Sequence, residues 1–426
     1  MKKVTEQKLK TKPDAWHKHN QASEVLQREG SLAIEELLNA NQAQFIQQTL
    51  EVEAEEFLGR KRYEHSESSK GYRNGSYPKR VMLPGSSVTI NKPHFRNTKE
   101  KFVSRILKSI ALLSEKVKMI ALEMYIRGLS TRDIEATLQE PDGRPMFSRS
   151  MISTLSERLY AQYQEFSQRD LSSFDVVYLF VDGVYESVKR YTNGQTLLCA
   201  WAICSDGTKR FVHLSAVESE SKDSWELFFE GMSKRGLRQP LLVISDGAPG
   251  LIAALEKYFP RADRQRCIAH KLRNIASKLP RDVQKVILEK IKAVYYAADT
   301  HSAEVLASLL IEKYAQAYPS AIQCFNDDLP SCITHLKYPL GHRRYIRTTN
   351  LLERSFEEQK RRTKVFPQHQ HERSCVGLVF AVLKRAADGW INVRMTELEL
   401  TQLKNIRALI CPKEVSTDYI SYQLAA

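Results

Sequence analysis

Three acidic residues lie in sequence contexts where a carboxylate could take part in chemistry. Asp182 interrupts the apolar run VVYLFVDGVYESV, where an unpaired charge would be costly. Asp246 follows LLVIS and precedes GAPGL, at the carboxyl end of an expected buried strand, where sites of α/β sheets concentrate. Glu353 lies in the cation-rich segment TTNLLERSFEEQKRRTK. Carboxylate oxygens suit Mg²⁺ or Mn²⁺, and two such ions about 3.5 to 4 Å apart can promote in-line displacement at a phosphodiester.

Each carboxylate also has a purely structural explanation. Asp182-Gly183 could form a hairpin turn, although Asn193-Gly194 already supplies one nearby. Asp246 could cap the following helix, and taken alone this is the better explanation. Glu353 completes a capping-box pattern with Asn350. The cations that follow Glu353 favour a role beside phosphates, and they are Arg354, Lys360, Arg361, Arg362 and Lys364.

The elements around these residues predict an α/β core. From residue 175, three runs rich in Val, Tyr, Phe and Leu are joined at Asn193-Gly194 and Asp206-Gly207, which indicates an antiparallel meander. A helix, a strand, a helix and a short strand follow, an order typical of a ribonuclease-H-like mixed sheet. We expect this core over 171–270 and 346–395, with an all-α insertion at 271–345 between its two parts.

The first hundred residues predict a helical region and then a basic ribbon. Apolar residues at helical spacing over 23–58 indicate one or two helices that end at Gly59, within a helical N-terminal region at 1–58. Residues 59–108 carry turn signals at Asn74-Gly75 and Pro84-Gly85, which favour a β-ribbon able to lie along a duplex.

Residues 109–170 predict short helices that resemble a helix-turn-helix. Ser130 and Asp133 form a capping-box pattern, PDGRP marks a turn, and Ser148 opens another helix. This last helix would present four residues to the major groove: Arg149, Ser150, Ser153 and Thr154. A plain helical bundle explains the same spacing equally well. The basic flanks favour DNA, and residues 396–426 are left as a C-terminal tail.

The positive charge of the chain is concentrated in two stretches. The net charge is +14 at a pI near 9.3, and residues 60–108 hold 13 Lys and Arg against 3 Asp and Glu, while residues 331–390 hold 12 against 5. This distribution favours binding to a phosphate backbone over an anionic membrane surface. Arg73, Lys79 and Arg80 are the candidate contacts on the ribbon.

Other features of the composition favour an intracellular protein. The sequence contains no apolar run long enough to span a membrane, and its seven cysteines form no C-x-x-C pair. We therefore expect a cytoplasmic, nucleoid-associated protein in a reducing compartment, without a membrane partner.

Seven segments in order resemble the Mutator-type transposases of bacterial insertion sequences, which are DDE recombinases with a ribonuclease-H-like core. The resemblance covers roughly residues 50–390 and rests on GYRNGSYPKRV, GLSTRDI, FVDGVY, DSWELFFEGMSKRGL, VISDGAPGL, QRCIAHKLRNI and TTNLLERSFEEQKRRTKVFP. It implies an enzyme that binds the terminal inverted repeats of its element and carries out metal-dependent strand cleavage and strand transfer.

The resemblance also implies roles for particular residues. The acidic triad of the family falls on Asp182, Asp246 and Glu353, which would hold two Mg²⁺ or Mn²⁺ ions. Two further family positions fall on the C-x-x-H pair Cys267 and His270, and Trp225 and Asn350 are accessory positions. Phe356 departs from the family pattern, which has a polar residue there. The implied partner is double-stranded DNA, both element ends and target, bound by at least a homodimer because two ends must meet.

Three alternatives remain open at this point. A ribonuclease-H-like, structure-specific DNA nuclease would share the acidic site without needing the basic N-terminal region, and a non-catalytic DNA-binding relative would lack the chemistry. A tyrosine or serine recombinase would form a covalent protein–DNA adduct. For a transposase, we expect that removal of residues 1–165 abolishes selectivity for specific ends and spares the fold of the core.

Overall fold

The chain forms two compact units. The computed structural model describes residues 15–64, 70–83, 86–139, 143–186, 195–364 and 371–410. The first unit is Met1–Tyr125 together with Leu129–Leu155, and the second is Ile126–Gly128 together with Ser156–Ala426. Each unit is treated below by itself.

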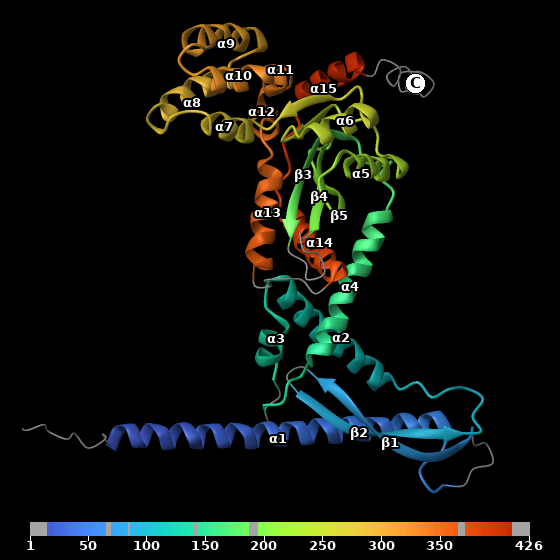
Figure 1. Ribbon diagram of the computed structural model, residues 1–426. Helices are drawn as coiled ribbons and strands as arrows, with labels where there is room; N and C mark the ends of the chain where they lie inside the picture. The colour runs from blue at the N-terminus through green and yellow to red at the C-terminus, as the bar shows by residue number, and fades with distance from the viewer. Residues whose placement is uncertain are drawn as a thin grey trace, which may run out of the picture. The chain divides into compact units, whose positions relative to one another are not determined.

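In the first unit a long helix lies along a two-stranded ribbon (Figure 1). Helix α1 (Ala15–Leu58) is a single helix that ends at Gly59, whose φ of 69° is a conformation that glycine adopts readily. Strands β1 (Tyr72–Leu83) and β2 (Ser86–Arg96) pair antiparallel, which confirms the predicted ribbon. Ile46 and Leu50 of α1 pack against apolar residues of both strands.

One of the two turns predicted in the ribbon is wrong. Asn74-Gly75 is not a turn but lies inside β1, where the pairing register shifts between Arg73 and Ser76 and Gly75 has a φ of 79°. The same dipeptide suits a β-bulge because both features need a residue that tolerates positive φ. Pro84-Gly85, between the two strands, lies outside the described residues.

Three helices occupy the segment where a helix-turn-helix is expected: α2 (Arg105–Ile126), α3 (Thr131–Thr137) and α4 (Arg149–Gln168). Ser130 and Asp133 form the predicted capping box, in which each side chain accepts a hydrogen bond from the backbone N–H of the other residue. Ser148 accepts a hydrogen bond from the Met151 N–H at the start of α4. Part of the PDGRP segment, residues 140–142, lies outside the described residues.

The second unit is built on a mixed five-stranded sheet of order β5-β4-β3-β6-β7. Its strands are β3 (Val176–Glu186), β4 (Gln195–Cys204), β5 (Lys209–Val217), β6 (Leu242–Ser245) and β7 (Asp263–Arg266). The first three form the predicted antiparallel meander, and β6 and β7 continue the sheet parallel to β3. Gly207 turns the chain from β4 to β5 with a φ of 79°, whereas Asn193-Gly194 lies outside the described residues.

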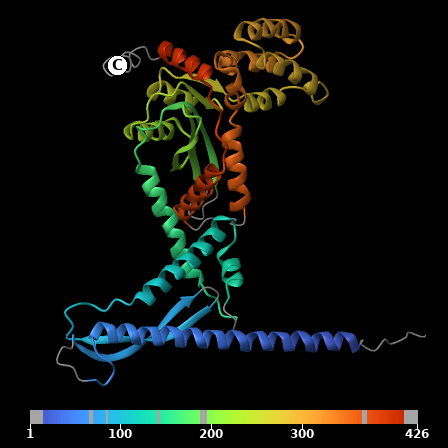
Figure 2. The same ribbon diagram turned by 180° about the vertical axis from the view of Figure 1, so that it is seen from behind.

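Helices cover both faces of this sheet (Figures 1 and 2). One face packs against α5 (Lys222–Lys234) and α6 (Pro249–Tyr258), and the other against α13 (Asn350–Thr363) and α14 (Glu372–Asp388). Because neither face meets water, the strands need no polar alternation, and this explains the continuous apolar runs in the sequence.

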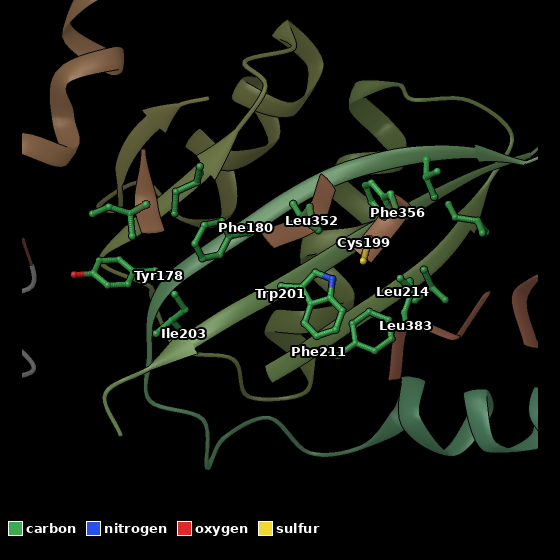
Figure 3. Close-up of a cluster of buried hydrophobic side chains, with 14 of the residues drawn as sticks. Tyr178, Phe180, Cys199, Trp201, Ile203, Phe211, Leu214, Leu352, Phe356 and Leu383 are labelled. Atoms are coloured by element: carbon green, nitrogen blue, oxygen red, sulfur yellow. The ribbon is translucent and has the colours of Figure 1, made fainter. Parts of the chain in front are cut away.

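The alternation of side chains along β3 divides its residues between two cores. Leu179 and Val181 face the α5 and α6 side. Tyr178 and Phe180 face the α13 and α14 side, where Figure 3 shows them on the same face of the sheet as Trp201. Each fully buried side chain of this size contributes roughly 1.5 to 3 kcal/mol to folding. The strand that carries Asp182 is therefore held firmly on both faces.

Between β7 and α13 the chain makes a long helical excursion over residues 268–346, all of them described. It contains α7 (Ile268–Ala276), α8 (Arg281–Tyr295), α9 (Thr300–Tyr314), α10 (Pro319–Asp327), α11 (Leu329–Ile333), the 3-10 turn η1 (Thr334–Lys337) and α12 (Leu340–Ile346). The elements from α7 to η1 share a core of their own, whereas Ile346 of α12 belongs to the core under α13 and α14. The helical character predicted for 271–345 is thus present, and α15 (Glu397–Ile410) follows the second part of the core.

Buried polar contacts fasten this excursion to the sheet. Gln265 of β7 accepts a hydrogen bond from the His335 N–H at 2.7 Å and donates one to the Cys332 carbonyl at 2.9 Å. Arg266 and Lys271 both pair with Asp328, with Lys271 Nζ 2.6 Å from its carboxylate. Since the Lys271 side chain is only 2% exposed, this ion pair lies largely out of water.

The two ends of the excursion meet each other. The Ile268 N–H donates to the Arg347 carbonyl at 3.0 Å. The Thr349 N–H and hydroxyl both donate to the Cys267 sulfur, at 3.3 and 3.2 Å. The chain therefore leaves β7 and enters α13 at nearly the same place.

Candidate active site

Asp182 and Asp246 come from neighbouring parallel strands. Asp182 lies within β3 opposite Cys199 of β4, so the explanation of Asp182-Gly183 as a hairpin turn is wrong. Asp246 directly follows β6, and Phe180 of β3 is in register with Ile244 of β6, two residues before each acid. Both carboxylates thus emerge at the same edge of the sheet.

Local hydrogen bonds orient the two carboxylates. Asp182 accepts one from the Gly183 N–H at 2.9 Å, and Asp246 accepts one from the Ala248 N–H at 3.0 Å. Helix α6 begins at Pro249 with Ala248 as its N-cap. Asp246 therefore orders the turn before the helix and is not the helix cap itself.

The charge on Asp182 is poorly compensated. Burial and the neighbouring Asp246 carboxylate raise the pKa of Asp182 to about 7, with a smaller contribution from Glu220, while the Gly183 N–H and His270 act in the opposite direction. Burial penalises the ionised form, and a like charge adds to that penalty. A cation placed between these acids would relieve both effects.

Glu220 is a third acid at this edge, and the sequence did not single it out. A Cβ atom at Gly183 would lie 3.3 Å from its carboxylate oxygen, so the Glu220 side chain reaches close to the strand that carries Asp182. Burial and Asp246 also raise the pKa of Glu220. Nothing in the segment VESESKDS distinguishes Glu220 from Glu218, because the proximity to Asp246 arises only in the folded chain.

Glu353 lies on the first turn of α13, where Arg273 pairs with it and His270 lies close by. Its carboxylate accepts a hydrogen bond from Arg273 at 3.0 Å and lies 3.6 Å from the His270 ring nitrogen. The capping-box explanation is wrong, because Asn350 is the first residue of the helix and Thr349 is its N-cap. The helix begins one residue earlier than the capping-box pattern requires. Sequence patterns do not fix the first residue of a helix that closely.

A cavity of about 350 Å³ brings the first and third predicted acids together. It is lined by Asp182, Gly183, Val184, Tyr185, His270, Arg273, Glu353, Phe356, Glu357 and Lys360. Within the described parts of the chain, no three His, Cys, Asp or Glu side chains converge closely enough to hold a metal ion. Asp182 and Glu353 thus share a cavity in which Glu353 is paired with Arg273 and His270.

Cys267 and His270 lie beside this cavity. Cys267 is the N-cap of α7 and is buried. Burial would raise the pKa of its thiol, but interactions with His270 and Thr349 outweigh burial and lower it. The Cys267 side chain in turn raises the pKa of His270. The pair joins the start of α7 to the start of α13, which supports a positioning role for the C-x-x-H motif.

The other predicted site residues fall into three groups. Arg354 on α13 and Lys364 directly after it are exposed, whereas Arg361 and Arg362 both pair with Glu358. On β1, Lys79 and Arg80 are exposed and Arg73 pairs with Glu51 at 2.6 Å. On α4, the exposed residues are Arg149, Ser150, Ser153 and Thr154, of which Arg149 pairs with Glu135.

Trp225, which matches the family pattern, and Phe356, which departs from it, are both core residues. Trp225, on α5, is completely buried against the sheet. Phe356 is 7% exposed and packs in the core under α13 (Figure 3). This explains why an apolar residue is tolerated where the family pattern has a polar one.

None of the helices in the described parts of the chain is both long and apolar enough to cross a membrane.

Comparison with known proteins identifies the family. The profile of the family "Transposase, Mutator family" matches residues 15–393. The transposase for insertion sequence element ISRM5 of Rhizobium meliloti (strain 1021) is 29% identical over 348 residues, which cover 81% of this chain and 86% of that protein. The transposase for insertion sequence element IS256 in transposon Tn4001 of Staphylococcus aureus is 30% identical over 349 residues, covering 81% and 88%. The transposase for insertion sequence element IS6120 of Mycolicibacterium smegmatis is 31% identical over 276 residues, covering 65% and 85%. With a match over most of its length and acids gathered at one edge of its sheet, this chain belongs to the Mutator family of transposases.

Proposed function

We propose that the chain binds the terminal inverted repeats of its insertion sequence and cuts and joins DNA strands at a DDE site formed by Asp182, Asp246 and Glu353. The observation that carries this proposal is the placement of Asp182, within β3, and Asp246, directly after β6, at matching positions of adjacent parallel strands, with Glu353 lining the same cavity as Asp182. The sheet with helices on both faces supports a ribonuclease-H-like core, with residues 171–270 and 346–395 as its two parts.

The donor chemistry of the three acids suits two Mg²⁺ or Mn²⁺ ions, which Asp182, Asp246 and Glu353 would hold once they converge further. Every proposed ligand is a carboxylate oxygen, the donor that these ions prefer. The raised pKa of Asp182 marks a buried acid that lacks sufficient positive charge nearby. When bound, the ions would supply activation of the attacking oxygen and stabilisation of the leaving one.

Glu353 must exchange partners for this site to assemble. It is now held by Arg273 and His270. A DNA phosphate entering the cavity would compete for Arg273 through a charge-assisted hydrogen bond, and Lys360 lines the same cavity. Glu353 would then be free to turn toward Asp182. The phosphate would thus help to complete the site that cleaves it.

The same acids serve two successive displacements in this proposal. Water first attacks a phosphodiester at the element end and frees a 3′-hydroxyl. That hydroxyl then attacks a phosphodiester of the target DNA, so the leaving group of the first step is the nucleophile of the second. The reaction needs no covalent protein–DNA intermediate, and no side-chain nucleophile has to be supplied.

DNA recognition is assigned to the first unit. The exposed Lys79 and Arg80 of the ribbon support contacts to phosphates, and the exposed residues at the start of α4 support a helix-turn-helix in the major groove. The proposed regions are 1–58 helical, 59–108 ribbon, 109–170 helix-turn-helix and 271–345 insertion. Since two element ends must be joined to one target, the active complex on DNA contains at least two copies of the chain.

The test is an assay of cleavage and joining on labelled duplexes that carry the element's own ends. Wild type should release a 3′-hydroxyl and join it to target DNA with Mg²⁺ or Mn²⁺ and not with EDTA. Asp182→Asn and Glu353→Gln should each bind the ends and fail to cleave. Glu312→Gln, at an exposed position on α9, is the matched control and should retain both steps.

The alternatives give different results in the same assay. Retained cleavage in Asp182→Asn or Glu353→Gln would remove that residue from the site. Cleavage without joining in the wild type would indicate a nuclease, and binding without cleavage would indicate a DNA-binding relative. A protein–DNA adduct would point to a tyrosine or serine recombinase.

A further inference from the structure

The first unit contains a basic cavity that the proposed active site does not use. It measures about 700 Å³ and lies between the end of α1, the segment after it and the ribbon. The charged residues lining it are Glu51, Arg60, Lys61, Arg62, Arg73 and Arg96. Five cations against one acid favour an anionic ligand here, since clustered positive charge focuses the field inside a cleft.

Two arginines of this cavity each have a buried N–H donor without a hydrogen-bond partner among the described residues. Arg60 uses its terminal nitrogens on the Glu64 carbonyl at 2.7 Å and the Gly71 carbonyl at 3.3 Å, which fixes its guanidinium in place. Its Nε, and the second terminal nitrogen of Arg73, are buried and have no hydrogen-bond partner among the described residues. A buried donor left unsatisfied is costly, so a ligand with acceptor oxygens would be favoured here.

Two tyrosines offer open aromatic faces in the same cavity. The Tyr63 side chain is 89% exposed and the Tyr72 side chain 51%. The Arg62 guanidinium lies over the Tyr63 ring at 5.3 Å, and that of Arg60 over the Tyr72 ring at 5.4 Å. Tyr63 lies in a turn and has a φ of 66°, a conformation that is uncommon for an aromatic residue.

We propose that this cavity binds an unpaired nucleotide of the DNA, with its phosphate on Arg60 and Arg73 and its base stacked on Tyr63 or Tyr72. Basic grooves with exposed aromatic rings are the standard means of holding single-stranded nucleic acid, because every base has a face that can stack. The proposal rests on the proposed function, since it takes DNA as the partner. It adds a preference for unpaired ends that phosphate contacts from Lys79 and Arg80 alone would not produce.

The test measures binding by fluorescence anisotropy in EDTA, so that cleavage plays no part. The probes are one duplex with two unpaired thymidines at an end and the same duplex fully paired. Wild type should bind the overhang duplex more tightly. Tyr63→Asn should lose about 5- to 150-fold in affinity for the overhang duplex, the effect of one stacked base, with the paired duplex unchanged. Asparagine is chosen because it tolerates positive φ, and Tyr63→Phe should retain the preference.

Controls separate stacking from charge and from folding. Tyr77→Ala removes an exposed ribbon tyrosine that does not line the cavity and should leave the preference intact, and Lys79→Ala should weaken both duplexes alike. If Tyr63→Asn lowers the melting temperature of the protein, Tyr72→Leu serves as a second variant that also removes an aromatic ring from the cavity. Equal binding of the two duplexes by wild type, or an unchanged preference in both Tyr63→Asn and Tyr72→Leu, would overturn the proposal. Because the assay contains no divalent ion, either result leaves the cleavage proposal standing.

Discussion

The Asp182 carboxylate shows how a candidate catalytic residue can oppose the stability of its own fold. Its pKa is raised from 3.8 to about 7, mainly by burial and then by Asp246. A group whose folded pKa lies above its unfolded pKa favours folding while protonated and loses that contribution as pH rises. The ionised acid therefore destabilises the second unit at neutral pH and above.

We predict that Asp182→Asn is more stable than wild type in the absence of divalent ions. Above pH 7 the gain should be on the order of 1 to 3 kcal/mol, because the uncompensated charge is removed. The wild type should lose this stability as pH rises from about 4 to about 7, whereas the variant should not. Thermal unfolding in EDTA across this pH range measures the difference. A variant less stable than wild type at every pH would contradict the electrostatic explanation.

Glu220 leads to a prediction about metal affinity. Its carboxylate lies beside Gly183, and burial and the Asp246 carboxylate raise its pKa. Its negative charge should therefore help to attract cations to this edge of the sheet. Glu220→Gln should raise the Mg²⁺ concentration needed for half-maximal cleavage by about 10- to 100-fold, the usual cost of losing a group that supports metal ligands. Cleavage at saturating Mg²⁺ should approach that of wild type. Glu218→Gln is the control, and equal Mg²⁺ requirements for both variants would exclude this role.

The predictability of the site differs from residue to residue. Asp182 and Asp246 could be found because each interrupts or ends an apolar strand, and that signal lies within a few residues of chain. Glu220 and Arg273 could not be found in this way, since their proximity to the acids depends on how the sheet and α7 pack. The capping box at Asn350 was misjudged because the helix begins one residue earlier than that pattern requires.

At the scale of elements, the anchoring of the helical excursion determines where α7 and α13 begin. Gln265 ties β7 to the 3-10 turn, and Asp328 accepts both Arg266 and Lys271. The strands and helices here were predictable because the spacing of apolar residues that indicates them lies within a short stretch of sequence. These anchors join residues more than fifty positions apart, and no local pattern encodes them.

Asp328→Asn should strongly destabilise the second unit. The change leaves Arg266 and the buried Lys271 without a counter-charge, and breaking a buried ion pair in this way costs several kcal/mol. Since Asp328 is 30% exposed, we expect a loss of about 2 to 3 kcal/mol in urea denaturation. Asp327→Asn, one residue earlier and exposed, should change stability by less than about 0.5 kcal/mol. Similar losses for both variants would argue against the ion pair as the cause.

At the scale of the whole molecule, the division between the units defines where the chain can be cut. Removal of residues 1–165 would also remove Tyr160 and Tyr163, which pack against the core of the second unit. The second unit resumes at Ser156, within α4, so a fragment that begins there keeps both tyrosines.

A fragment of residues 156–410 should fold cooperatively and lose selectivity for the element ends. Its circular dichroism should show a single thermal transition, and its affinity for terminal-repeat and random duplexes should be equal. A fragment of residues 166–410 should unfold at a lower temperature because the contacts of Tyr160 and Tyr163 are lost. Retained selectivity in the 156–410 fragment would place end recognition in the second unit.

The meeting of Cys267 with Thr349 has a consequence for how this chain tolerates change. A segment whose two ends are already joined behaves as a closed loop, and doubling the length of such a loop costs only about 0.6 kcal/mol in chain entropy. The turn between α9 and α10, where Gln316 and Ala317 are exposed, is therefore a place where a foreign domain could be inserted with little disturbance to Asp246 and Glu353. If the proposed site is correct, a ligand-responsive domain inserted in that turn should make DNA cleavage depend on its ligand without any change to Asp182, Asp246 or Glu353.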